Sequence, residues 1–148
     1  MVIQFITNSI QNDYMYIISI HVELKLLIDA APFPECLSSL TNIEAIFMAN
    51  CSLVGSLPSW LGNLKELRQL DLQHNTCTGQ MPNEIGLLNN LLYLNVKDNI
   101  GLNGELPLEA IARLTKLNRL SLVNCSFSNS QEAVDILQVR LPRCRIWI

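Results

Sequence analysis

The sequence lacks the features that mark membrane-spanning and nucleic-acid-binding proteins. No uninterrupted apolar run reaches the length of about 18 residues that crosses a bilayer, because charged residues from Glu23 to Asp29 break up the best candidate, around residues 17–28. Basic residues are also few: ten Lys and Arg stand against thirteen Asp and Glu, for a net charge of −3. Phosphate binding needs a concentrated positive field, so we expect neither a transmembrane span nor a nucleic-acid partner.

Signals for secretion and for catalysis are also absent. The first residues, MVIQFITNSIQ, are apolar but include neither a basic region nor a small-residue cleavage site, so we do not assign a signal peptide. The chain offers no phosphate-binding loop, no activated nucleophile and no complete set of metal ligands. We therefore expect a protein that is not an enzyme, with no catalytic residue, no metal site and no cofactor.

The sequence does contain an internal repeat. The stretch IEAIFMANCSLVGSLPSWLGNL, from Ile43, aligns with LRQLDLQHNTCTGQMPNEIGLL, from Leu67, and the same step leads on to Leu91. Counted from the first apolar residue of each copy, offsets 1, 4 and 6 are apolar in four copies, namely Ile43, Ile46, Met48, Leu67, Leu70, Leu72, Leu91, Leu94, Val96, Leu117, Leu120 and Leu122. Glycine recurs at offset 13, proline at 16 and an apolar-glycine pair at 19 and 20, and the third copy is two residues longer than the others. These copies predict four regular coils.

Weaker copies flank the regular ones. Counting one repeat step back from Ile43 places Val22 and Leu24 at offsets 4 and 6. Counting one step on from Leu117 places three further residues in register, Leu141, Cys144 and Ile146. The whole chain therefore predicts about six coils.

A helix is expected near the C-terminus. The segment SFSNSQEAVDILQVRLP suits a cap helix, with Ser130 as its capping residue and Pro142 preventing its continuation. We expect Ala133, Ile136 and Leu137 to face the stack.

The spacing within each copy predicts a short strand with two different faces. Side chains at offsets 4 and 6 point inward, whereas those at 3, 5 and 7 point to the opposite face. Successive coils then stack into a parallel sheet with a strand spacing of about 4.8 Å. Glycine at offset 13 permits a tight backbone, and proline at 16 fixes φ. Because a single coil cannot bury its own apolar face, stability is expected to come from contacts between neighbouring coils.

The pattern LxxLxLxxNxLxGxIPxxLGxL, represented here by LRQLDLQHNTCTGQMPNEIGLL, resembles the plant-type leucine-rich repeat of receptor ectodomains. The resemblance implies an α/β right-handed solenoid with a short parallel β-sheet on its concave face, an irregular or 3-10 convex side and a C-terminal cap helix. We expect one domain over residues 1–148, with a degenerate N-terminal coil or cap at 1–42, regular repeats at 43–122, and the cap helix and last strand at 123–148. In such families the concave face and its rims bind proteins, peptides or glycans, and the repeat itself is not catalytic.

Offset 9 is expected to be structural. An asparagine amide there can satisfy backbone groups of adjacent turns, and a thiol can supply one weaker donor. The four residues at this offset are Cys51, Asn75, Asn99 and Cys125. Cys51 and Cys125 stand three coils apart, about 14 Å, which is too far for a disulfide.

The other cysteines leave the compartment open. Cys77 and Cys144 fall at inward offsets and are expected to fill the core, which leaves Cys36 as the one exposed thiol. Five cysteines without a reachable pairing favour a reducing compartment, whereas the family resemblance implies the cell exterior. The localisation is therefore unknown, and so is glycosylation at the sequons that begin at Asn50 and Asn124.

Two chemical interpretations of the second coil are rejected. His74 and Cys77 are three residues apart, but no second Cys/His pair completes a tetrahedral metal site. Asp71 and His74 have the residue types of a hydrolase triad, but no nucleophile motif or oxyanion loop accompanies them.

The candidate binding residues lie at offsets 3, 5 and 7, because these side chains have no part in core packing. The predicted ligand-binding set on the concave face is Phe47, Gln69, Asp71, Gln73, Tyr93, Asn95, Lys97 and Arg119. Phe47 and Tyr93 are outward aromatic residues among polar neighbours, a mixture that anchors interfaces. A second candidate, suited to an acidic partner, is the group Arg119, Arg143, Arg145 and Trp147.

Two functional hypotheses follow from these residues. The first is a recognition module that binds a protein or peptide on the concave face. The alternative is a structural or assembly fragment of a longer repeat array or receptor-like protein, with end-to-end self-association. The charge is unevenly spread along the chain: residues 1–109 carry four basic and eleven acidic residues, and residues 110–148 carry six basic and two acidic ones, which predicts a polarised rod.

Overall fold

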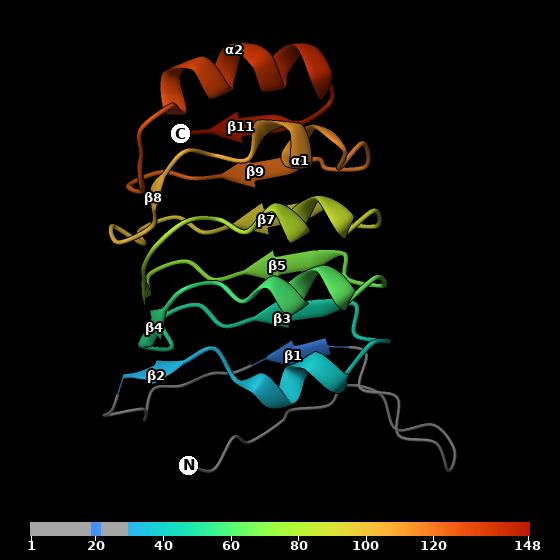
Figure 1. The fold of residues 1–148 in the computed structure, drawn as a ribbon. Helices are drawn as coiled ribbons and strands as arrows, with labels where there is room; N and C mark the ends of the chain where they lie inside the picture. The colour runs from blue at the N-terminus through green and yellow to red at the C-terminus, as the bar shows by residue number, and fades with distance from the viewer. Residues whose placement is uncertain (1–18, 22–29) are drawn as a thin grey trace.

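A computed structural model describes residues 19–21 and 30–148, with the backbone alone for 19–21. Six short parallel strands form one sheet in the order β1-β3-β5-β7-β9-β11. Their bounds are Ser19–His21 for β1, Ala45–Phe47 for β3, Gln69–Asp71 for β5, Tyr93–Asn95 for β7, Arg119–Ser121 for β9 and Arg145–Trp147 for β11. The coils therefore stack in chain order, from β1 at one end to β11 and the C-terminal helix at the other (Figure 1).

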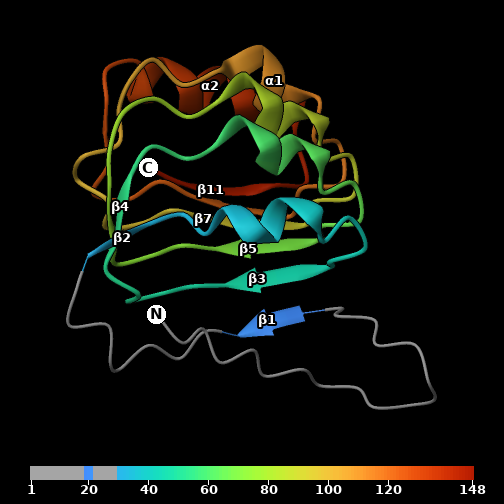
Figure 2. The ribbon, with the colours of Figure 1, turned by 60° about the horizontal axis from the view of Figure 1, so that its bottom comes forward.

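Short helices cover the side of the stack opposite this sheet (Figure 2). They are the 3-10 helices η1 (Glu35–Ser39), η2 (Ser59–Asn63) and η3 (Asn83–Leu87), followed by α1 (Leu108–Ala112) and α2 (Ser130–Arg140). Small parallel sheets connect the two sides: β2 (Ala31–Pro32), β4 (Leu53–Gly55) and β6 (Thr76–Cys77) form one, and β8 (Asn103–Gly104) and β10 (Ser126–Phe127) form another. This arrangement confirms the predicted solenoid, and we call the outward side of the six-stranded sheet the concave face.

One apolar core runs through the stack between the two sides. The residues predicted to point inward are buried; Ile46, Leu70, Leu94 and Leu120 are each 0% exposed. The apolar-glycine pair is explained by close approach of the coils, because a Cβ atom added to Gly86 would lie 2.6 Å from the carbonyl oxygen of Ala110. Only a hydrogen fits at that position.

The glycine at offset 13 is explained by backbone conformation. Gly55 and Gly79 have φ angles of 79° and 78°, in the left-handed region that favours glycine. The prediction of a tight backbone there is confirmed.

The predicted register of both end coils is wrong by two residues. In the first coil Ile20, not Val22, pairs with Ile46, and Val22 and Leu24 lie outside the described residues. In the last coil Ile146, rather than Cys144, pairs with Leu120. The last shift has a clear cause, because the helix α2 of 11 residues replaces the five-residue helix of a regular coil and lengthens the return to the sheet.

The C-terminal cap helix is confirmed, but its predicted cap is not. Ala133 and Leu137 are fully buried as expected, whereas Ile136 is half-buried. The residue at the N-cap position is Asn129 rather than Ser130. The Asn129 side chain accepts a hydrogen bond from the backbone nitrogen of Leu106 (2.8 Å), and Ser130 donates back to the carbonyl of Phe127 (3.0 Å). The cap position is therefore used to join α2 to the preceding coil.

Candidate functional site

A ladder of buried asparagines fixes the ends of the strands beneath the concave face. The Oδ1 atom of Asn75 accepts hydrogen bonds from the backbone nitrogens of Cys51 (2.9 Å) and Leu53 (3.0 Å). Its Nδ2 atom donates to the carbonyls of Met48 and Leu72, both at 2.8 Å. Each of these contacts satisfies a backbone group that would otherwise be buried without a partner. The ladder thus locks one coil to the next.

Asn99 repeats this arrangement one coil later. Its amide accepts from the backbone nitrogen of Cys77 (3.1 Å) and donates to the carbonyls of Leu72 (2.9 Å) and Val96 (2.8 Å). Cys125 occupies the same offset and offers one weaker bond, from its Sγ atom to the carbonyl of Val96 (3.3 Å). The prediction that offset 9 is structural agrees with these contacts.

The parallel register arranges the outward side chains of the sheet into two columns. One column is Ala45, Gln69, Tyr93, Arg119 and Arg145, and the other is Phe47, Asp71, Asn95, Ser121 and Trp147. Neighbours within a column come from adjacent strands, so their backbones are about 5 Å apart. The two-residue shift in the last coil places Arg145 beside Arg119 and Trp147 beside Ser121.

A hydrogen-bond network joins four of the predicted site residues at the centre of the face. Asp71, which is only 9% exposed, accepts from the Tyr93 hydroxyl (3.3 Å) and from Nδ2 of Asn95 (3.1 Å). The backbone nitrogen and Nε2 of Gln73 also donate to the Asp71 carboxylate, at 3.2 and 3.3 Å. Asn95 Nδ2 further donates to the Tyr93 hydroxyl (2.9 Å). These side chains hold each other in place.

The network changes the acidity of Tyr93. Burial raises the pKa of the Tyr93 phenol above its ordinary value of 10.0, and the nearby negative charge of Asp71 raises it further. The hydrogen bond from Asn95 and the positive charge of Arg119 act in the opposite direction but are outweighed. Tyr93 therefore presents a neutral hydroxyl over the whole neutral pH range.

The concave face is hollowed between β3 and β9. The hollow has a volume of about 460 Å³ and is lined by Phe47, Gln69, Asp71, Leu92, Tyr93, Asn118 and Arg119. An aromatic ring stands at one end, a guanidinium at the other, and polar groups lie between them. This combination can hold an extended polar ligand with at least one apolar side chain.

Charged side chains form a rim beside the hollow. Asp98 lies 3.1 Å from Nδ1 of His74 and 3.5 Å from Nζ of Lys97, and it accepts a hydrogen bond from Asn124. The bond from Asn124 is the main cause that lowers the pKa of Asp98 below 3.8, with smaller contributions from the charges of Lys97 and His74. His74, Asp98 and Asn124 all have left-handed backbones, with φ of 54°, 56° and 57°. The same turn therefore recurs in successive coils, and the contacts of Asp98 with His74 and Asn124 link these turns.

Five of the eight predicted residues meet at the hollow, namely Phe47, Gln69, Asp71, Tyr93 and Arg119. Gln73 and Asn95 lie beside it through the Asp71 network, whereas Lys97 belongs to the rim. The sequence reasoning missed Leu92 and Asn118, which line the hollow from offset 2. No signal in the strand alternation marks that offset, since it precedes the strand itself.

The cysteines lie as expected except Cys144, which the shifted register of the last coil moves off the inward offset. Cys36 is exposed, Cys51 and Cys77 are buried, and Cys125 and Cys144 are half-buried. Burial raises the pKa of the Cys77 thiol to about 11, and it does the same for Cys144. Neither thiol is a ready nucleophile at neutral pH, because the reactive form is the thiolate.

Two kinds of feature do not occur in residues 19–21 and 30–148. No group of three His, Cys, Asp or Glu side chains there gathers to hold a metal ion. Within the same residues, no helix is long and apolar enough to cross a membrane.

Comparisons with known proteins find a similar geometry in leucine-rich-repeat proteins, several of them plant receptors. The family model described as "Leucine Rich Repeat" matches residues 42–64 and 66–88. No curated protein matches the chain. Among solved structures, a TDR receptor is 32% identical with a TM-score of 0.69 over 78% of this chain. A chain in the BIR3–SERK2 complex from Arabidopsis thaliana is 33% identical, with a TM-score of 0.62 over 66% of this chain. The plant peptide hormone receptor RGFR1, solved in complex with RGF2, is 29% identical, with a TM-score of 0.58 over 66% of this chain.

The chain covers only part of each of these proteins. It spans 19% of the TDR receptor chain, 52% of the matched chain in the BIR3–SERK2 complex and 15% of the RGFR1 chain. What is shared is the stack of coils, with the parallel sheet on one side and the short helices on the other. The repeat pattern, this stack and these likenesses together identify the chain as a leucine-rich-repeat protein with repeats of the plant type.

Proposed function

We propose that the protein is a non-enzymatic recognition module that binds a peptide or an extended protein segment on its concave face. The observation that carries the proposal is the hollow of about 460 Å³, in which Phe47 and Arg119 stand at opposite ends of a polar floor. A mixture of an aromatic anchor and fixed polar groups is typical of binding sites rather than of an ordinary solvated sheet.

The Asp71 network supports this proposal through preorganisation. Asp71, Tyr93 and Asn95 are bonded to one another, so little side-chain freedom remains to be lost when a ligand binds. The Tyr93 hydroxyl presents a fixed polar group to a peptide backbone, and Asn95, which is only 4% exposed, holds that hydroxyl in place. Residues on the strands themselves are also held more rigidly than residues on loops.

The solved structures support the same class of partner. One similar protein is a peptide hormone receptor in complex with RGF2, and another is in the structure of PEPR1–AtPEP1. A third is in the complex of BIR3 with SERK2. We extend to this chain only the general statement that a peptide or protein is bound.

The test is a selection of binding peptides from a random library on the purified protein. Their dissociation constants are then measured for Phe47→Ala and Tyr93→Ala. We expect each substitution to weaken binding about tenfold, as for anchor residues of an interface. Leu87→Ala is the matched control, because Leu87 is 41% exposed on the helical side of the stack. Peptides that bind all three variants and the wild type equally would show that the concave face is not the binding site.

We also propose, as a second candidate, assembly through the last strand. Among the described strands, β11 pairs only with β9, and Trp147 and Ile148 are 44% and 39% exposed. Open strand edges with apolar side chains favour pairing with another chain. Light scattering over a wide concentration range tests this candidate; a strict monomer throughout would exclude it. Both candidates treat residues 1–148 as one domain.

A further inference from the structure

The charge of the concave face is opposite to that of the chain. Among the described residues at offsets 3, 5 and 7 of the coils from β3 to β11, Asp71 is the one acidic group, whereas Lys97, Arg119 and Arg145 are basic. The whole chain, by contrast, has ten basic and thirteen acidic residues. A positively charged face on an acidic protein creates a local potential that attracts anionic partners.

The acidic group on this face is not available to balance the arginines. The Asp71 carboxylate is 9% exposed and already accepts hydrogen bonds from Gln73, Tyr93 and Asn95. Lys97 is also committed, because it pairs with Asp98 at 3.5 Å. Arg119 and Arg145 remain, both exposed and neither with an ion-pair partner among the residues that the structure describes.

These two arginines are direct cross-strand neighbours. Arg145 is the register partner of Arg119, which puts their backbones about 5 Å apart on one face. Like charges placed directly opposite each other destabilise a sheet. A carboxylate between the two guanidinium groups would accept hydrogen bonds from both and remove the repulsion.

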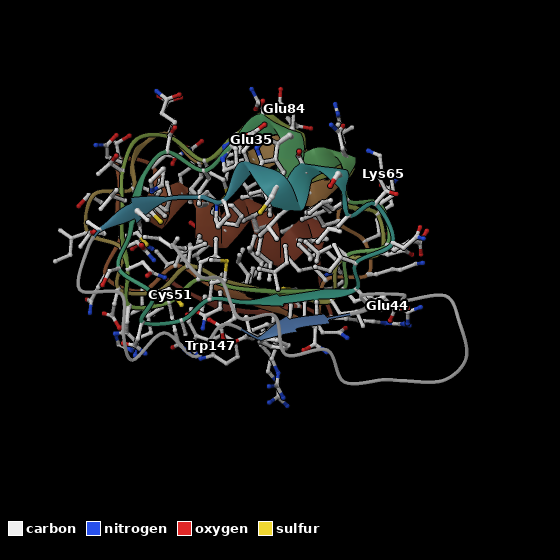
Figure 3. The ribbon with its side chains drawn as sticks, turned by 90° about the horizontal axis from the view of Figure 1, so that it is seen from below. Glu35, Glu44, Cys51, Lys65, Glu84 and Trp147 are labelled. Carbon is white, nitrogen blue, oxygen red and sulfur yellow. The ribbon has the colours of Figure 1, made fainter. Side chains whose placement is uncertain are left out.

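The surroundings of the pair fit a peptide rather than a free ion. Arg119 lines the hollow that also contains Phe47 and Tyr93, so the basic pair is continuous with it. Trp147, 44% exposed on the same strand as Arg145, adds an aromatic surface beyond the pair. Figure 3 looks along the stack and shows Trp147 on the sheet side, opposite to Glu35 and Glu84 on the helical side.

We propose that Arg119 and Arg145 form an acid-recognition subsite, at which an extended peptide lying in the hollow places an Asp or Glu side chain. This inference rests on the proposed concave-face function and names the chemistry of the partner. Arginine suits such a subsite because its planar guanidinium can bind a carboxylate through two hydrogen bonds.

The probe for the test is a short peptide of alternating Glu and Tyr, acetylated and amidated at its ends. Its Gln–Tyr counterpart has the same length without charge, and a Gln–Tyr peptide with a free C-terminus supplies a terminal carboxylate. Nuclear magnetic resonance follows the Nε–Hε signals of the arginines during titration of the full chain. We expect the Glu peptide to shift Arg119 and Arg145 most, and Arg68, Arg113 and Arg140 little.

Substitutions then measure the contribution of each charge. Arg119→Gln and Arg145→Gln should each weaken binding of the Glu peptide about fivefold, as for a partly exposed charge pair. Arg113→Gln is the control, since it removes an exposed arginine on the helical side at the end of α1. Arg119→Lys keeps the charge but should also weaken binding, because the two-pronged contact is lost.

The outcomes separate this inference from the function on which it rests. If the Glu and Gln peptides both shift the amide signals of Phe47 and Tyr93 but not those of the two arginines, the subsite is wrong and the concave-face function stands. Binding of the free-terminus Gln peptide alone would assign the arginines to a chain terminus and overturn the inference. An oligothymidylate that shifts the same arginines at lower concentration would also overturn it, in favour of nucleic acid.

Discussion

Oδ1 of Asn75 lies 2.9 Å from the backbone nitrogen of Cys51, a residue 24 positions earlier in the chain. One side chain thereby closes a contact between two coils that the sequence keeps far apart. The same amide also satisfies Leu53, Met48 and Leu72, so the buried edge of two coils depends on one residue.

Replacing that residue should be costly. Asn75→Ala leaves several buried backbone groups without partners, and we expect the free energy of unfolding to fall by about 3 kcal/mol. Asn103→Ala is the matched control, because Asn103 is an exposed asparagine on β8 and should change stability by less than about 0.5 kcal/mol. Urea denaturation measures both. Equal losses for the two variants would contradict a structural role for the ladder.

The Asp71 carboxylate should control the titration of Tyr93. The folded pKa of Tyr93 is raised, so its contribution to stability is present below pH 10.0 and is lost as the pH rises through the folded pKa. Asp71→Asn removes the negative charge and should move the Tyr93 pKa down toward 10.0. Tyrosinate absorbance follows the titration, and comparison with Tyr93→Phe identifies the part of the absorbance change that comes from Tyr93. An unchanged midpoint in Asp71→Asn would rule out the electrostatic contact.

The rim should contribute a stability that acid removes. The pKa of Asp98 is lowered in the folded state, so its stabilising effect is present above pH 3.8 and is lost as the pH falls through the folded pKa. Wild type should therefore resist urea better than Asp98→Asn at pH 6, and the two curves should converge once the pH has fallen below the folded pKa of Asp98. A difference between the curves that stays constant with pH would show that the ionised carboxylate is not responsible.

The thiols should differ sharply in reactivity. Cys36 is exposed, whereas Cys77 is buried and its pKa is raised to about 11. A disulfide reagent at pH 8 should label Cys36 fastest in the native protein and label the buried Cys51 and Cys77 only as the stack opens. Cys36→Ser should abolish the fast phase. A fast phase that survives this substitution would mean that a second thiol is accessible.

The regular coils were predictable because the offset of a residue determines its burial. Ile46, Leu70 and Leu94 recur at one offset, and each is fully buried. The end coils were not predictable by counting, since their copies are too weak to show where extra residues enter. Ile146 therefore pairs two residues away from its expected position.

The site was predictable as a face but not as a set of contacts. Alternation assigned Asp71, Tyr93 and Asn95 to the outward side, and all three are there. Their mutual hydrogen bonds join side chains from adjacent strands, at sequence separations of up to 24 residues. Such contacts depend on rotamers and on register rather than on the local pattern. The same holds for Leu92 and Asn118, which complete the hollow.

The asparagine ladder also affects where the stack of coils unfolds first. Asparagines occupy its two central positions, whereas the thiols of Cys51 and Cys125 flank them and offer weaker bonds. Amide exchange should consequently be slowest in β5 and β7 and faster toward both ends. The hollow lies over these slow strands. A bound peptide would therefore contact strands that stay folded while the end coils open and close. Local unfolding of the protein would then not limit the lifetime of the complex.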